Sequence, residues 1–79
     1  MFKPRLETRK MAEFVATDNE GRQYVIFEFQ DFFEHHLLKG RVAWVAGMKD
    51  FQLADGSPLI QTSKDTFELA STGATVRRR

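Results

Sequence analysis

The chain of 79 residues contains no cysteine, which excludes disulfide bonds and thiolate metal sites. Its longest apolar run, residues 42–46, is far too short to cross a bilayer. No apolar run follows the charged residues at the start of the chain, so the N-terminus does not match a secretory signal. Together these absences predict a small cytoplasmic protein without membrane contact.

Aromatic side chains are abundant instead, with eight phenylalanines among 42% hydrophobic residues. Because large rings remove much apolar surface from water, their burial is the expected main source of stability in so short a chain. A chain of this length forms one domain at most. We therefore expect residues 11–79 to form a single β-rich domain.

Charge is unevenly placed along the chain. Residues 1–10 hold four basic residues and one acid, and residues 77–79 are three arginines. Residues 11–76 hold ten acidic and five basic residues. The sequence thus predicts an acidic body with two basic ends, and we expect residues 1–10 to form a flexible basic arm.

The clearest structural signal is a β-hairpin around Asp18-Asn19-Glu20-Gly21. Aspartate first and glycine fourth are typical of a type I turn followed by a left-handed glycine, which is a common three-residue hairpin loop. Alternation along the two strands then defines two faces. One face carries Phe14, Ala16, Tyr24 and Ile26, and the other carries Met11, Val15, Val25, Phe27 and Phe29. Since both faces are apolar, either residues 32–48 or a second subunit must cover the one that does not face the core.

A second hairpin is predicted at Asp55-Gly56, which is a strong two-residue turn signal. Pro58 follows at once, so the return strand lies at an edge or begins there. Phe67 and Leu69 alternate inward on a further strand, and residues 74–77 form the last. The predicted fold is mainly β, a small antiparallel meander of five or six strands that forms a rolled sheet or a small barrel.

Residues 31–40 allow two interpretations. Asp31 and Glu34 resemble a capping box and Gly40 a helix end, which together predict a short helix within 32–40. Alternation of Phe27, Phe29, Asp31, Phe33 and His35 instead favours a continued strand. We expect a strand as far as about Phe33 and then a turn or short helix. Residues 41–48 form a short strand or a packed loop.

Several of these motifs resemble a family of short proteobacterial β-rich proteins. The pattern includes a Thr-Asp-x-x-Gly-Arg-x-Tyr hairpin (residues 17–24), Gly47-Met48-Lys49, an Asp-Gly-x-Pro turn (residues 55–58), Asp65-Thr66-Phe67-Glu68-Leu69 and Thr72-Gly73. The resemblance covers most of residues 12–78 and implies the fold. It implies no activity, cofactor or catalytic residue.

Motifs for chemistry are weak. His35 and His36 are adjacent and point apart on a strand, whereas zinc needs three or four convergent ligands. The carboxylates fall at turns or at outward strand positions, and no serine forms a nucleophile motif with a histidine. We therefore expect a non-enzymatic protein without cofactor or metal.

Two kinds of partner remain. The first is a second copy of the chain or another protein, contacted through exposed aromatic side chains or a strand edge. The candidate interface residues are Tyr24, Phe27, Phe29, Phe33 and Trp44. The second is nucleic acid, bound if the basic ends gather into one phosphate-binding patch. The candidate phosphate contacts are Lys3, Arg5, Arg9, Lys10, Arg77, Arg78 and Arg79. Self-association is the first prediction and nucleic-acid binding the alternative.

Overall fold

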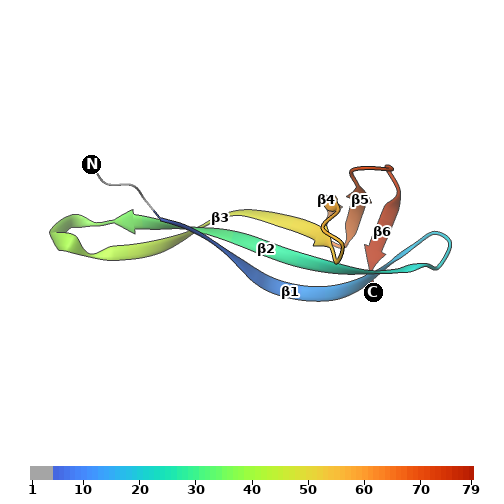
Figure 1. The fold of residues 1–79 in the computed structure, drawn as a ribbon, viewed down its shortest axis with the longest axis horizontal. Helices are drawn as coiled ribbons and strands as arrows, with labels where there is room; N and C mark the ends of the chain where they lie inside the picture. Colours follow the sequence, from blue (N-terminus) through green and yellow to red (C-terminus); the bar gives the residue numbers. More distant parts are fainter. Residues whose placement is uncertain (1–4) are drawn as a thin grey trace.

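The computed structural model describes residues 5–79 and confirms a mainly β fold. The six strands are β1 (Leu6–Asp18), β2 (Gln23–His36), β3 (Val42–Leu53), β4 (Pro58–Ser63), β5 (Thr66–Leu69) and β6 (Thr75–Arg78). Each strand pairs antiparallel with the next, and β6 returns to pair with β1 at residues 16–18. The meander therefore closes into a small barrel, which lies at one end of the molecule (Figure 1).

The first hairpin has the predicted register and turn. Ala16 lies opposite Tyr24 and Phe14 lies opposite Ile26. At the turn, the backbone N–H of Gly21 donates to the Asp18 carbonyl at 3.1 Å, and Gly21 has a φ of 81°. That left-handed conformation favours glycine, which has no side chain to clash with the backbone.

The second hairpin differs from the prediction in its loop. Gly56 donates its N–H to the Leu53 carbonyl, and Leu53 donates to the Ser57 carbonyl. This is the pattern of the first turn, so the loop has three residues rather than two, with Gly56 left-handed at a φ of 92°. Pro58 is the first residue of β4, a position that tolerates a missing N–H.

The core lies entirely inside the barrel. Its buried residues are Ala16, Ile26, Phe51, Leu53, Leu59, Phe67, Leu69 and Val76. The ring of Phe67 lies at its centre, with centroids 4.8 Å from Phe51 and 5.6 Å from Phe14. The inward positions predicted for Phe67 and Leu69 are confirmed.

Beyond the barrel, three strands continue together as a long extension, which we define as residues 5–12 and 29–49 (Figure 1). The molecule measures 56 × 21 × 19 Å. Its radius of gyration is 16.2 Å, against about 12 Å for a compact chain of this length. No residue of the extension is buried. Residues 32–48 therefore do not fold back over the sheet, and this way of covering the second apolar face is excluded.

The extension also corrects two expectations. Strand β1 begins at Leu6, so residues 6–10 belong to the sheet and not to a flexible arm, while residues 1–4 lie outside the described part of the chain. Strand β2 continues to His36, and the short segment η1 (Leu38–Gly40) that follows is a turn, because Lys39 and Gly40 have left-handed backbone angles. Asp31 caps no helix, because its carboxylate accepts a hydrogen bond from the Thr8 hydroxyl at 2.8 Å. Residues 42–48 are strand rather than loop.

Candidate interaction surface

One face of the extension carries an apolar row that crosses all three strands. Leu6 lies opposite Phe33, and Phe33 lies opposite Val45. These side chains are 60%, 43% and 49% exposed. Gly47 makes room for the row, since a Cβ there would lie 2.2 Å from Cε2 of the Phe33 ring. Phe33 is thus held against the backbone of β3, beside Val45, where a partner can reach both.

Phe27 and Phe29 lie on the same face nearer the barrel and are half-buried. Their rings meet edge to face, with centroids 6.3 Å apart. The Lys10 ammonium lies 4.1 Å from the Phe27 centroid and forms an ion pair with Glu13 at 2.8 Å. These two predicted interface residues are therefore partly covered within the chain itself.

Trp44 lies on the opposite face of the extension. The Arg9 guanidinium lies 4.7 Å from the Phe32 ring centroid and 5.9 Å from that of Trp44. Glu7 holds the same guanidinium through two hydrogen bonds of 3.1 Å. This face is accordingly a mixture of ring and paired charge, whereas the row of Leu6, Phe33 and Val45 has no charged member.

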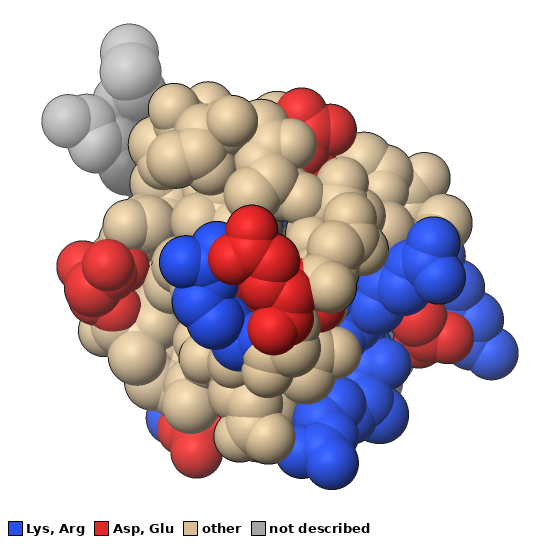
Figure 2. Space-filling model, turned by 90° about the vertical axis from the view of Figure 1, so that its right-hand side faces the viewer, with Lys and Arg blue, Asp and Glu red and all other residues tan. Residues whose placement is uncertain are grey.

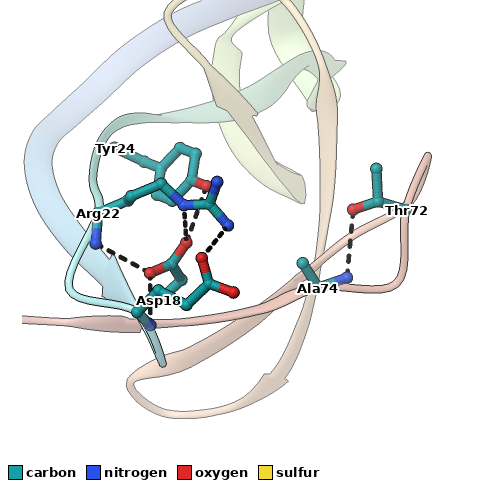
Figure 3. A network of polar contacts seen from close by, with 6 residues as sticks. Asp18, Arg22, Tyr24, Thr72 and Ala74 are labelled. Atoms are coloured by element: carbon teal, nitrogen blue, oxygen red, sulfur yellow. Dashed lines mark hydrogen bonds and ion pairs between the residues drawn. The ribbon is translucent and has the colours of Figure 1, made fainter.

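The fifth predicted interface residue, Tyr24, belongs to the barrel. Its hydroxyl donates to Oδ2 of Asp18 at 3.0 Å, and the same carboxylate accepts bonds from Arg22 and from the backbone N–H of Glu20 (Figure 3). Burial acts to raise the pKa of Asp18, but these bonds and that from the backbone N–H of Arg22 outweigh it and hold the pKa below its usual value. The network fixes the first turn and leaves Tyr24 little freedom to meet a partner.

The same network predicts how Tyr24 titrates. Its hydrogen bond to Asp18, followed by burial and the negative charge of that carboxylate, raises the pKa of the phenol above 10.0. A raised folded-state pKa stabilises the fold below about pH 10, and this stabilisation is lost as the pH rises through the folded value. Tyr24 is the single tyrosine, so alkaline absorbance titration reports it alone. We expect Asp18→Asn to lower the midpoint toward 10 and Asp65→Asn to leave it unchanged; equal midpoints in all three proteins would contradict the assignment.

The predicted basic ends do not form one patch in the described part of the chain. Arg5, Arg9 and Lys10 lie on the extension, and Lys3 lies outside the described residues. Arg77 and Arg78 lie on β6, opposite Thr17 and Ala16 at the far end of β1, and Arg79 follows. Figure 1 shows the start of β1 well away from the C-terminus.

The two basic groups also differ in their surroundings. On the extension, Arg5 lies 3.9 Å from Glu34, while Arg9 and Lys10 are paired with Glu7 and Glu13. At the barrel end, the Arg78 guanidinium lies 4.2 Å from the Phe14 ring centroid and so covers one side of the core. Lys and Arg atoms gather along one side of this end, with Asp and Glu atoms among them (Figure 2).

His36 and one surface depression each lie beside a carboxylate. His36 contacts the Glu34 carboxylate, and among residues 5–79 no group of three metal-ligating side chains comes together. A shallow, open depression is lined by Gln23, Tyr24, Val25, Leu53, Ala54 and Asp55. The Asp55 carboxylate there accepts a hydrogen bond from the backbone N–H of Ser57 at 2.8 Å. Aspartate commonly stabilises a turn through this bond to the residue two positions later.

Sequence reasoning overlooked one feature of this surface, the outer edge of β3. Residues 42–48 contain no charged side chain and lie between Arg41 and Lys49. The segment includes the longest apolar run of the chain, residues 42–46, so a signal is present in the sequence. Its position at a sheet edge depends on the length of β2.

Comparisons with known proteins add no identification. No family model, curated protein or solved structure matches the chain. The resemblance to short proteobacterial proteins therefore stays a prediction. Within the described residues, no helix is both long and apolar enough for a membrane span.

Proposed function

We propose that this protein is a non-enzymatic assembly domain that associates with a second copy of itself through the extension. The supporting observation is that three paired strands project from the barrel with no buried residue and with an exposed apolar row of Leu6, Phe33 and Val45. Two-sided apolar sheets need a cover, and residues 32–48 do not supply one. A two-fold dimer uses the same surface on both subunits, so a second copy brings an identical apolar row to the interface.

The amount of exposed surface supports the same partner. The chain exposes 5995 Å², whereas a compact monomer of 9.2 kDa exposes about 4,900 Å². The excess, about 1,000 Å², is of the order that one subunit contributes to a standard protein–protein interface, about 800 Å². The extension has no buried residue, whereas all eight core residues lie in the barrel, so an excess of exposed surface is expected from the extension.

Nucleic-acid binding has weaker support. On the extension, Arg5, Arg9 and Lys10 lie beside carboxylates, which compete with phosphate for their guanidinium and ammonium groups. The arginines of the C-terminus lie at the opposite end of the molecule. We retain the cytoplasm as the expected location, from the absence of cysteine.

Light scattering across a concentration series tests the proposal. We expect the mass to rise from 9.2 kDa toward twice that value within the micromolar range. Phe33→Asp is expected to shift this rise to higher concentration, since it places a charge in the apolar row. Ile60→Asp, at a side chain 56% exposed on the barrel, is the matched control and leaves the curve unchanged. A mass of 9.2 kDa at every concentration would rule out self-association.

A further inference from the structure

Strand β3 has one unpaired edge along the extension. Residues 42–53 pair with β2 on one side, but on the other side β4 pairs only with Phe51 and Gln52. Within the described residues, the backbone of β3 from Val42 to Asp50 therefore turns one row of N–H and C=O groups to solvent. An exposed row of this kind is a template for another strand, and natural proteins protect it when it is not used.

The extension has two unpaired edges, those of β1 and β3, and they differ in the charged side chains that protect an edge from pairing. The edge of β1 carries Arg5, Glu7, Arg9 and Lys10, and charged side chains on an edge oppose pairing. The edge of β3 has no charge over residues 42–48 and no proline. Of the two edges, β3 is the one that its sequence leaves open to a second chain.

Resting on the self-association proposed above, we infer that two copies pair along β3, antiparallel, about a two-fold axis at Val45. The two extensions then form one continuous six-stranded sheet. A two-fold axis perpendicular to an antiparallel pair requires one residue to face its own copy, because opposite side chains share a face of the sheet. The position of the axis can therefore be read from the residues that each register brings together.

Charge complementarity favours the axis at Val45. Strand β3 carries a bulge, since its register with β2 passes from Gln30–Lys49 to Phe32–Ala46 and so places Gly47 and Met48 together opposite Asp31. In this arrangement the partner's β3 pairs across the bulge as β2 does, with one residue opposite both Gly47 and Met48. Ala46 then faces Trp44 of the second copy, Lys49 faces its Val42 and Asp50 faces its Arg41. Arg41 has extended backbone angles and can continue the strand.

Arg41 and Asp50 are suited to form ion pairs between the two copies. Among the described contacts neither side chain has an ion-pair partner within its own chain, and the axis at Val45 joins them twice across the interface. An axis at Ala46 places Asp50 against Ala43, and one at Trp44 carries Asp50 past Arg41 into the turn of η1. Only the register at Val45 sets the two opposite charges against each other.

The same register extends the apolar row. Leu6, Phe33 and Val45 are consecutive cross-strand neighbours in one copy. Pairing at Val45 joins the row to its symmetry mate, so six apolar side chains cross the combined sheet without interruption. On the other face, Trp44 meets Ala46 of the second copy, a small residue that leaves space for the indole ring.

Cysteine cross-linking tests this arrangement, because the chain contains no cysteine of its own. Opposite residues of an antiparallel pair have Cα atoms about 4.5–5.5 Å apart, which lies within the range for a disulfide. We expect Val45→Cys to form a covalent dimer under mild oxidation at least about tenfold faster than Ile60→Cys. Val45 and Ile60 are 49% and 56% exposed, so the two thiols are similarly accessible.

The outcomes separate this inference from the proposed function. Fast cross-linking of Val45→Cys with a dimeric wild-type mass supports pairing along β3. A dimeric wild type whose Val45→Cys variant cross-links no faster than Ile60→Cys overturns the pairing and leaves self-association standing. A monomeric wild type overturns both. Circular dichroism of the two variants checks that each retains the β fold.

Discussion

Replacing Phe67 with alanine is expected to unfold the barrel at room temperature or bring it close to unfolding. Phe67 is 1% exposed and packs against Phe51 and Phe14, with centroids at 4.8 and 5.6 Å. Truncating a buried phenylalanine costs roughly 3–5 kcal/mol. A domain of this length has a free energy of unfolding of about 4–12 kcal/mol, so the loss is a large share of the total. Urea unfolding followed by circular dichroism measures it.

Two variants make this result specific to the core. Phe67→Leu keeps most of the apolar volume and is expected to cost much less than the alanine variant. Phe33→Ala removes the same atoms from a ring that is 43% exposed on the extension. Measured at a concentration where the protein is monomeric, it is expected to change the free energy of unfolding by less than about 1 kcal/mol. Equal losses from Phe67→Ala and Phe33→Ala would contradict the placement of the core in the barrel.

Local turn chemistry made the barrel predictable from sequence. Gly21 and Gly56 take the left-handed conformation that their turns require, and each turn fixes the register of the strands beside it. Alternation then assigns Phe67 and Leu69 to the interior. The loop at Gly56 was predicted one residue too short, because an Asp-Gly pair serves both two- and three-residue hairpin loops.

The extension was harder to predict because its form depends on contacts distant in sequence. Strand β2 continues through residues that resemble a helix start, since pairing with both β1 and β3 satisfies its backbone. The helix-start preference of Asp31 and Glu34 is weak compared with the two rows of backbone hydrogen bonds that pair β2 with β1 and β3. Once β2 is this long, residues 32–48 form a projecting hairpin and cannot cover the sheet.

The distance between the two basic ends was also hard to predict from sequence. Net charge along the chain identified two basic segments but not their separation in space. Strand β1 spans 13 residues, and its antiparallel course carries Arg5 and Arg9 away from β6. Ion pairs such as Arg5–Glu34 join segments far apart in sequence, and only the register of β1 with β2 reveals them.

Val45→Lys is expected to abolish the dimer over the concentration range in which the wild type associates. On the proposed axis this residue faces its own copy, so the substitution sets two ammonium groups directly opposite each other and removes an apolar contact from the centre of the row. Like charges in opposite positions of an antiparallel pair are destabilising. We expect the dissociation constant to rise by at least about a hundredfold, which corresponds to about 2.7 kcal/mol. Light scattering measures it.

Mixing with Val45→Glu makes the test decisive, because the symmetry of the interface predicts a rescue. Val45→Glu alone is expected to be monomeric for the same reason as Val45→Lys. An equimolar mixture of the two places a lysine opposite a glutamate and should recover a dimer of twice 9.2 kDa that weakens as salt is added. Ile60→Lys mixed with Ile60→Glu is the control, in which each protein alone already dimerises as the wild type does. If the Val45 variants stay monomeric when mixed, residue 45 does not face its own copy, and the two-fold axis lies elsewhere on the extension.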